Sequence, residues 1–297
     1  MQNGILSKPL IAQEYAAEVT AFNETMRGEG IRDIDRYYWY HTIDLPMAPT
    51  PGMYDFRQSV DCFDLPVSMS GQRVLDIGSA TGFFAFEFER RGAEVVSVEL
   101  PSLEQLDRFP GQETSSLLRK LQHMIVPHSV DVLEPLTRDY SAQELHYYLL
   151  DAPFRLCAKL LGSRVKRHFS SVYDLSAERL GHAGFDFVFL GDILVHTLRP
   201  VDALMAAAKL CSGTLMVAQM MPGEPSDPPA MAYMGGSDPA ADDICWWLPN
   251  ENCFHGLLSK LGFARVRTIG THEGLLRPAG HHFSRRIIRA DRARTLA

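Results

Sequence analysis

The sequence lacks the cysteine pattern of a disulfide-rich or zinc-binding domain. Its five cysteines are odd in number and scattered, and no two of them are separated by only two residues. They are Cys62, Cys157, Cys211, Cys245 and Cys253. These spacings argue against a disulfide framework and against a cysteine-bound zinc ion.

Long apolar runs are also missing. No run approaches the roughly 18 apolar residues that a membrane-spanning helix needs. The first residues, MQNGILSKPLIAQEY, have no charged start followed by a long apolar core, so we predict no signal peptide. The expectations are therefore no membrane association and a cytoplasmic location.

Positive charge is not in excess. The net charge is −7, so binding to nucleic acid would need a local basic patch. Hydrophobic residues make up 46% of the 297 residues and charged residues 22%, which excludes wholesale disorder. This length suits one large domain with embellishments, or two small domains.

The centre of the chain alternates apolar strands with amphipathic helices. Strands are expected at residues 73–77, 93–99, about 164–169, 185–191, 214–220, near 263–269 and near 283–289. Helices are expected between them, for example at 82–91 and 254–261, and a loop rich in proline, glycine and aspartate at 222–243. Continuous apolar strands joined by helices predict a parallel sheet that is covered on both faces.

The first 70 residues differ from this pattern. Tyr15, Val19, Phe22 and Met26 fit one stripe of a helix. An aromatic cluster at 37–41 and a proline-rich connector follow. We therefore predict an N-terminal extension or lid at 1–70 and a main domain at 71–297, with an insertion at about 101–150.

The stretch LDIGSATG lies between the first expected strand and its helix. Ligands of such sheets bind at the carboxyl ends of the strands. Gly78, Ala80 and Gly82 permit a tight turn and close approach of a ligand to the backbone. The stretch is neither the G-x-G-x-x-G dinucleotide fingerprint nor a P-loop. Asp76 would repel a pyrophosphate and suits a ligand with a positive group.

Two further acids follow the next expected strands. Glu99 ends the second strand, where it can accept hydrogen bonds from ribose hydroxyls. Asp174 follows the third strand and could hold an adenine amino group. An adenosine with a cationic tail in place of phosphates is S-adenosylmethionine (SAM), so SAM is the predicted cofactor.

This arrangement resembles the class I SAM-dependent methyltransferases. The residues at 76, 78, 80 and 82 look like their first motif, with alanine at 80 for the usual glycine, and FLGDILVH at 189–196 looks like their fourth-strand motif. The resemblance implies an α/β fold: a Rossmann-like, doubly wound, mostly parallel sheet of seven strands with an antiparallel C-terminal hairpin and a helical insertion after the second strand. It also implies a SAM site, whose assigned residues are Asp76, Gly78, Ala80, Gly82, Glu99, Tyr173, Asp174, Leu175 and Gly191.

A narrower likeness concerns the tRNA wobble-uridine carboxymethyltransferase family and its methyltransferase relatives. The stretches YYWYHTIDLPMAPTPG, LVHTLRP and WWLPNENCFHGLLSKLGF are similar to segments of that family. The family uses carboxy-SAM, and a tyrosine before the histidine of the fourth-strand motif helps to bind the extra carboxylate. Val195 occupies that position here, which favours ordinary SAM.

Two residues at the end of the fourth strand are candidates for the catalytic base. His196 titrates near neutrality and strand ends face the site, but it could instead cap or brace the loop. Asp192 lies in the same loop, and its alternatives are a role on the SAM side or in helix capping. A base is needed where the nucleophile is a hydroxyl or an ammonium group.

Five residues are candidates for contact with the methyl acceptor. Trp39 and His41 could cover the pocket or stack on a substrate, or could brace the N-terminal helix against the core. Arg199 could bind an acidic group or lie on the surface. Trp246 and Trp247 could form a substrate wall or pack in the core.

The insertion contains His123, His128, Asp131 and His146, whose spacings match no strong metal signature, so no metal is predicted. The insertion is expected either to cover the substrate side or to build a contact between two copies of the chain in a homodimer.

Three functions remain open from the sequence. The first is SAM-dependent methyl transfer to a hydroxyl, amine or carbon of a small molecule. The second, methyl or carboxymethyl transfer to a tRNA wobble uridine, would need the basic stretches KLLGSRVKRHF and SRRIIRADRAR to form a binding surface. The third is a protein that binds SAM without catalysis.

Overall fold

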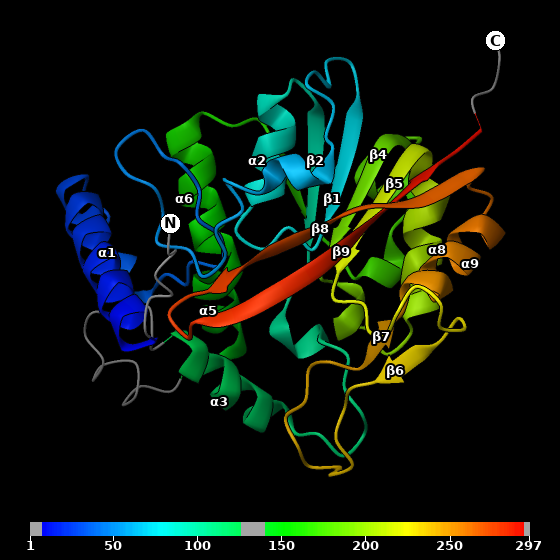
Figure 1. Cartoon of the computed structure of the whole chain (residues 1–297). Coiled ribbons are helices and arrows are strands. Elements are labelled where there is room, and N and C mark those ends of the chain that lie inside the picture. Colours follow the sequence, from blue (N-terminus) through cyan, green and yellow to red (C-terminus); the bar gives the residue numbers. More distant parts are fainter. Residues whose placement is uncertain (1–7, 126–139, 294–297) are drawn as a thin grey trace, which may run out of the picture.

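A seven-stranded sheet forms the centre of the molecule. The computed structural model describes residues 8–125 and 140–293. The strands run in the order β3-β2-β1-β4-β5-β9-β8 (Figure 1). Their bounds are β1 (Arg73–Ile77), β2 (Glu94–Glu99), β3 (Lys166–Phe169), β4 (Phe185–Gly191), β5 (Cys211–Gln219), β8 (Arg265–Leu276) and β9 (His281–Asp291).

The pairing pattern confirms the predicted fold class. Strands β1 to β5 are all paired in parallel. Strand β9 pairs antiparallel with both β5 and β8, so the last two strands form the reversed hairpin at one edge. The apolar stretches in β1, β4 and β5 are buried because helices cover both faces of the sheet.

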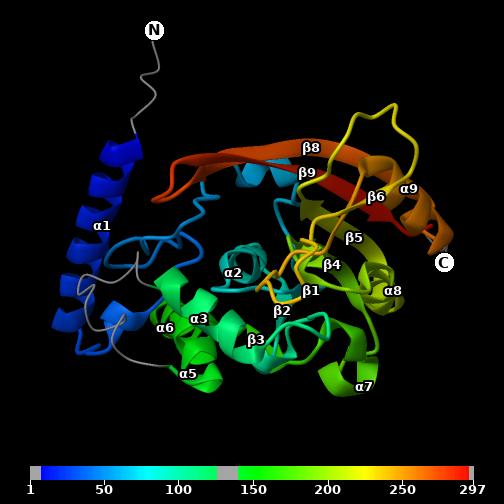
Figure 2. The ribbon, with the colours of Figure 1, turned by 90° about the horizontal axis from the view of Figure 1, so that it is seen from below.

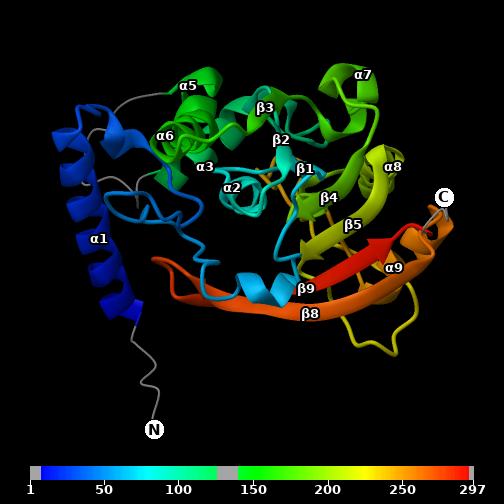
Figure 3. The same cartoon turned by 90° about the horizontal axis from the view of Figure 1, so that it is seen from above.

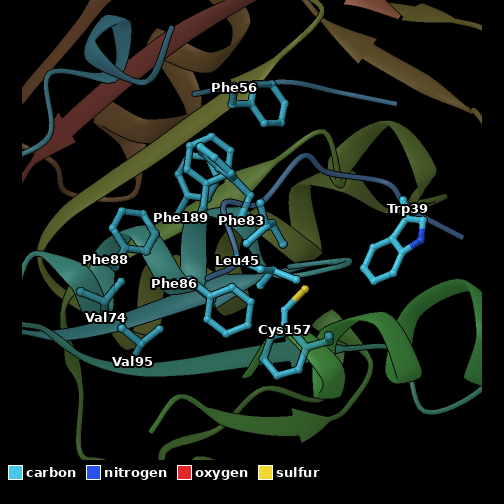
Figure 4. Packing of buried hydrophobic residues seen from close by; sticks show 14 of the residues in the cluster. Trp39, Leu45, Phe56, Val74, Phe83, Phe86, Phe88, Val95, Cys157 and Phe189 are labelled. Carbon is cyan, nitrogen blue, oxygen red and sulfur yellow. The ribbon is translucent and has the colours of Figure 1, made fainter. Parts of the chain in front are cut away.

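Two separate clusters of buried side chains hold the helices on the sheet. On one face lie α2 (Phe83–Arg90) and α6 (Ala152–Leu161); on the other lie α7 (Ala177–Leu180), α8 (Pro200–Leu210) and α9 (Glu251–Lys260). Figures 2 and 3 show α2 between the sheet and the N-terminal segment, and α8 and α9 together on the far side. Helix α2 is buried on nearly all sides, which explains its run of phenylalanines (Figure 4).

The N-terminal extension packs into the same cluster as the sheet. The predicted stripe lies in α1 (Lys8–Gly28), and all four of its residues are buried. Two short 3-10 turns follow, η1 (Ile34–Arg36) and η2 (Val60–Phe63). Phe22 and Trp39 meet edge to face, with their ring centroids 5.2 Å apart. The division at residue 70 remains a prediction, because the extension and the sheet share one core.

The insertion after β2 is helical, as predicted. It contains η3 (Leu103–Gln105), α3 (Thr114–Ile125), α5 (Ala142–His146) and a π-helical turn, η5 (Tyr147–Asp151). Ser141 and Glu144 begin α5 with a reciprocal capping box. Two more 3-10 turns, η6 (Val172–Asp174) and η7 (Leu194–His196), follow β3 and β4.

The loop predicted at 222–243 is not entirely irregular. Strand β6 (Met231–Tyr233) lies inside it and pairs antiparallel with β7 (Trp247–Pro249). This small sheet escapes sequence analysis because each strand has only three residues, and short strands leave no periodic pattern.

The C-terminal hairpin is longer than the sequence predicts. Strands β8 and β9 have 12 and 11 residues, and the hairpin extends beyond the sheet toward α1 (Figure 1). The extra residues are rich in glycine and histidine and show no apolar alternation, so their pairing is not predictable. At the tip, Arg277 donates hydrogen bonds to the carbonyl oxygen of Gly52 from Nε (3.1 Å) and Nη2 (2.8 Å).

None of the described helices is both long and apolar enough to cross a lipid bilayer.

The contacts of Arg277 predict a stabilising role for the hairpin tip. Arg277 also pairs with Glu18 of α1 at 2.6 Å and lies over the ring of Tyr15. We expect Arg277→Ala to lower the free energy of unfolding by about 1–3 kcal/mol, because the carbonyl of Gly52 loses the two hydrogen bonds that Arg277 donates and Glu18 loses its ion-pair partner. Arg267→Ala, at an exposed position on β8, the strand that leads to the tip, is the matched control and should change stability by less than about 0.5 kcal/mol. Urea denaturation measures both, and equal effects would contradict the role of Arg277.

Candidate functional site

A cavity of about 250 Å³ lies at the carboxyl ends of β1, β2 and β4. Its walls come from parts of the chain that are far apart in sequence: the N-terminal extension, the turn after β1, the insertion, and the β8–β9 hairpin. Strand ends of a doubly wound sheet are the expected place for a ligand. The cavity is therefore the candidate site.

The turn after β1 has an unusual backbone. Gly78, Ala80 and Gly82 all adopt left-handed conformations, with φ angles of 74°, 46° and 99°. At Gly78 a Cβ atom would lie 2.9 Å from Cδ1 of Ile193, so a side chain there would collide with the loop after β4. Ala80 has a Cβ in this conformation and is therefore strained.

Two charged side chains hold Ala80 in that conformation. Oε2 of Glu99 accepts a hydrogen bond from the backbone N–H of Ala80 at 2.9 Å. Arg167 in β3 donates from Nη1 to the carbonyl oxygen of Ala80, also at 2.9 Å. The guanidinium is 7% exposed, lies 3.8 Å from Oε2 of Glu99 and packs over the ring of Phe154. We call Glu99, Arg167 and the backbone of Ala80 the turn clamp.

Asp76 is the second buried acid of the cavity. Burial raises the pKa of its carboxyl to about 7, and the nearby Glu99 contributes to the rise. Its Oδ2 is buried and finds no hydrogen-bond partner among the described residues. A buried carboxylate oxygen without a partner is costly, so a ligand with a donor or a positive group would relieve it.

Near Asp76 and Glu99, acidic side chains outnumber basic ones. Asp76 and Glu99 line it, and Arg167 is the cation that lies close to both. One oxygen of Glu99 already binds Ala80, and the other accepts from the N–H of Leu100 at 3.0 Å. Each oxygen keeps a second lone pair for a ligand hydroxyl. These hydrogen-bond acceptors therefore fit a nucleoside that carries a positive group.

His196 lies in η7, at the end of β4. Its Nδ1 donates to the carbonyl oxygen of Ile244 at 2.6 Å, so in the neutral ring Nε2 is the nitrogen that accepts a proton. Burial lowers the pKa of His196, but contacts with the Cys245 side chain and the Ile244 carbonyl outweigh it, and the pKa is raised. His196 lines the cavity, so its position and its tautomer both suit a base.

Asp192 lies next to His196 on the same wall and is paired. It accepts a hydrogen bond from Nε of Arg285, in β9, at 2.5 Å. Burial raises the pKa of Asp192 although Arg285 opposes the rise. Its φ of 49° is left-handed, a strained conformation that occurs often at functional sites.

The N-terminal extension contributes residues to the cavity wall. The N–H of His41 donates to Oγ1 of Thr81 at 3.0 Å, which ties the extension to the turn after β1. Burial lowers the pKa of His41 to about 3, so its ring is neutral. Tyr40, His41 and Tyr54 line the cavity, and the role of this segment as a lid remains a prediction.

The structure brings many of the predicted site residues together. The following line the cavity: His41, Asp76, Gly78, Ala80, Glu99, Tyr173, Gly191, Asp192 and His196. Tyr173 also donates a hydrogen bond to Asp107 of the insertion. The functional roles of these residues remain predictions.

Three residues predicted to bind the cofactor lie outside the cavity wall. Asp174 is exposed, because it ends a 3-10 turn whose buried residue is Val172. Leu175 belongs to the hydrophobic core. Gly82 is the N-cap residue of α2, and a Cβ atom there would meet the rings of Phe86 and Phe154.

Four residues predicted to contact the acceptor are also placed elsewhere. Trp39 is fully buried and stands apart from Phe56 and Phe189 in Figure 4, so it braces the extension. Trp246 is buried and donates from Nε1 to the carbonyl of Asp107 at 3.1 Å. Trp247 packs on Tyr233 in the small sheet. Arg199 is mainly exposed and lies 4.1 Å above the ring of Tyr173.

Several cavity residues are not predicted by the sequence. They are Tyr40, Tyr54, Phe56, Phe63, Asp107, His272 and Arg285. Each comes from the extension, the insertion or the hairpin, where no motif signals a site. In the sequence Arg167 resembles a surface charge because its neighbours Lys166 and His168 are also basic, and its inward direction depends on the pairing of β3.

Among the described residues, no group of three or more histidine, cysteine, aspartate or glutamate side chains could hold a metal ion. His128 and Asp131 lie outside the described residues. His146 binds the carbonyl oxygen of Leu100 through Nε2 at 2.6 Å.

Comparison with known proteins shows the fold. No family model and no curated protein sequence matches the chain. Among solved structures, the N-terminal domain of EvdMO1, determined in the presence of SAH and D-fucose, is 12% identical, with a TM-score of 0.50 over 90% of this chain and 97% of that domain. EvdMO1 itself matches with the same identity and TM-score over 90% of this chain and 47% of that chain.

A more distant match is magnesium protoporphyrin IX methyltransferase from Synechocystis PCC 6803 with bound SAM. It is 14% identical, with a TM-score of 0.41 over 75% of this chain and 71% of that chain. The names of the two EvdMO1 structures include no tRNA substrate, and the likeness to the tRNA wobble-uridine family remains a prediction.

The raised pKa of Asp76 predicts a pH-dependent stability. Its folded-state pKa of about 7 lies above the usual 3.8, so the folded state binds the proton more tightly than the unfolded state. Asp76 therefore lowers the free energy of unfolding progressively as the pH rises from about 4 to about 7. Asp76→Asn removes this titration. The free energy of unfolding of the variant minus that of the wild type should therefore increase, by up to about 1.4 kcal/mol for each unit by which the pH rises.

Urea denaturation of both proteins at pH 5, 6 and 7 measures this difference. Asp174→Asn, at an exposed position outside the cavity, is the matched control. If the free energy of unfolding depends on pH in the same way in the wild type and in Asp76→Asn, the raised pKa of Asp76 is contradicted.

Proposed function

We propose that the protein is a SAM-dependent methyltransferase that acts on a small molecule. The observation that carries this proposal is the pair of buried acids, Asp76 and Glu99, on either side of a strained small-residue turn at neighbouring strand ends. The fold that the chain shares with EvdMO1 supports the proposal, since that structure was determined with SAH.

Each residue at this end of the cavity has its own task. Glu99 accepts hydrogen bonds from the ribose hydroxyls. Asp76 attracts the positively charged part of the cofactor, and Gly78 lets the cofactor approach the backbone closely. Tyr173 forms part of the wall on the nucleoside side, where its hydroxyl is fixed by Asp107. SAM, when bound, would supply a methyl group attached to a positively charged sulfonium sulfur. After transfer of the methyl group, the leaving group is SAH, in which the sulfur is a neutral thioether.

Ordinary SAM, and not carboxy-SAM, is the proposed cofactor. Val195 stands where a carboxylate-binding tyrosine would stand, and its side chain is apolar and buried. The carbonyl oxygen of Val195 accepts a hydrogen bond from the N–H of Trp246 at 2.7 Å, so this oxygen already binds the segment that leads into β7.

The chain positions the acceptor and removes its proton. Holding the nucleophile in line with the bond that breaks is the main source of rate in such a reaction. Nε2 of His196 takes the proton of the nucleophile, while Nδ1 stays bonded to Ile244 and fixes the tautomer. The new bond joins the nucleophile to the methyl carbon, and the electrons of the old bond remain on sulfur.

A small-molecule acceptor fits the charges better than tRNA does. Of the basic residues in the first predicted stretch, Arg167 points inward and belongs to the turn clamp. In the second stretch, Arg286 pairs with Glu251 at 3.1 Å and Arg289 pairs with Asp291 at 3.1 Å. These charges are already neutralised, so they offer little attraction to phosphates.

Variants of the two acids test cofactor binding. We expect Asp76→Ala and Glu99→Ala each to weaken SAH binding by about tenfold to a hundredfold, since each removes a charged hydrogen-bond acceptor. Asp174→Ala is the matched control, because this aspartate is exposed and outside the cavity. Isothermal titration calorimetry measures all three. Equal affinities for SAH in the wild type and in both cavity variants would overturn the proposed site.

The role of His196 has its own test. We expect His196→Ala to reduce methyl transfer from labelled SAM by about a hundredfold or more, while SAH affinity changes little. A base must be unprotonated, so turnover of the wild type should rise with pH through the raised pKa of His196. His182→Ala, which contacts Phe185 away from the cavity, is the control. A fully active His196→Ala protein would remove His196 as the base.

A further inference from the structure

The cavity has two chemically different ends. The first end carries Asp76, Glu99 and Tyr173. The second end lies against β4, η2 and the β8–β9 hairpin. Among the described residues, the acid at this end is Asp192, which is paired with Arg285. The residues at this second end line the cavity but have no role in the proposed binding of the cofactor.

Six rings form a continuous surface at the second end. We call it the aromatic wall; its members are Tyr54, Phe56, Phe63, Phe84, Phe189 and His272. Phe84 and Phe189 have ring centroids 4.4 Å apart, and Phe63 and Phe84 4.8 Å. Tyr54 and Phe56 are nearly parallel, with an interplanar angle of 10°. Such a wall presents ring faces and edges that a further planar ring can complement.

His272 is the polar member of the wall. It is 1% exposed, and its ring lies 4.6 Å from that of Phe56 and 5.1 Å from that of Phe283. Both of its nitrogens are buried, and neither has a hydrogen-bond partner in the part of the chain that the structure describes. Burial lowers the pKa of His272 to about 4, so its ring is neutral and offers one donor and one acceptor.

The charges at this end cancel. Arg285 and Asp192 form a partly buried pair, and Arg285 also donates from Nη1 to the carbonyl oxygen of Ser284 at 3.2 Å. An anionic acceptor would find a cation that is already neutralised, and a cationic acceptor would find a carboxylate that is already paired. The second end is therefore suited to an uncharged molecule.

We propose that the aromatic wall is the methyl-acceptor subsite, and that it takes an uncharged, planar aromatic molecule whose hydroxyl group pairs with His272. This inference rests on the proposed function, since it assigns the acceptor of the same transfer. The planar body of the acceptor stacks on the rings of the wall. Its hydroxyl supplies the partner that the imidazole of His272 lacks, because a hydroxyl both donates and accepts.

Two alternative roles of the aromatic wall lead to different binding results. If the rings serve only as hydrophobic core, no aromatic probe binds there. If the rings hold the adenine of the cofactor, an aromatic probe competes with SAH. Binding of an aromatic probe to the protein saturated with SAH therefore separates the acceptor subsite from both alternatives.

The test uses the full chain saturated with SAH and four probes of similar size. 2-Naphthol has the planar body and the hydroxyl, naphthalene lacks the hydroxyl, decahydro-2-naphthol lacks the planar body, and 2-naphthoate adds a negative charge. Affinities come from saturation-transfer NMR titrations, and SAH affinity is measured by calorimetry with and without 2-naphthol. We expect 2-naphthol to bind about tenfold more tightly than decahydro-2-naphthol and 2-naphthoate, and to leave SAH affinity unchanged.

The variant His272→Phe isolates the hydrogen bond. It keeps the aromatic surface and removes two buried nitrogens without partners among the described residues, so the fold should be kept. We expect 2-naphthol to bind about tenfold more weakly to this variant, while naphthalene binds as before or more tightly. His182→Phe, away from the cavity, is the matched control and should change neither affinity.

The outcomes are distinguishable. If SAH does not bind the wild type, the proposed function fails. If SAH binds but 2-naphthol does not, or displaces SAH, or binds no better than its saturated analogue, the acceptor subsite fails alone. If His272→Phe weakens both aromatic probes equally or neither of them, the role of His272 in holding the hydroxyl is wrong.

Discussion

The turn clamp is the constraint on which the site depends. Ala80 adopts a left-handed conformation that alanine avoids, and it does so because Glu99 holds its N–H and Arg167 holds its carbonyl. Both side chains come from strands that are neighbours in the sheet, so the pairing of β2 with β3 sets the shape of the turn. The same clamp brings a second acid beside Asp76 and leaves an excess of buried negative charge. The fold thus creates the electrostatic condition that a cationic nucleoside satisfies.

The extension, the insertion and the hairpin supply the remaining walls of the site. The extension is tied to the turn through His41 and Thr81, and the hairpin tip is tied to the extension through Arg277 and Gly52. These attachments enclose a cavity with an acidic end and an aromatic end. We propose that the acidic end takes the charged cofactor and the aromatic end an uncharged planar acceptor. The base candidate, His196, also lines the cavity.

The sequence predicts the fold class and places Asp76 and Glu99 at neighbouring strand ends, but it does not reveal Arg167, which completes the turn clamp. Apolar strands of the parallel sheet and the small-residue turn are local patterns, so the fold class and the positions of Asp76 and Glu99 could be predicted. The aromatic end could not, because His272 and Arg285 depend on a hairpin register that no local pattern specifies. Trp39 could not be placed from the sequence either. It precedes two residues that line the cavity, and the sequence does not show whether a tryptophan at this position faces the cavity or the core.

A crystal structure of the chain grown with SAH tests the central claim most directly. The account predicts density for the nucleoside at the acidic end, with both ribose hydroxyls bonded to Glu99, the turn clamp intact, and the aromatic wall left uncovered. Density for SAH over the aromatic wall, or elsewhere on the protein while the acidic end holds only solvent, would contradict it.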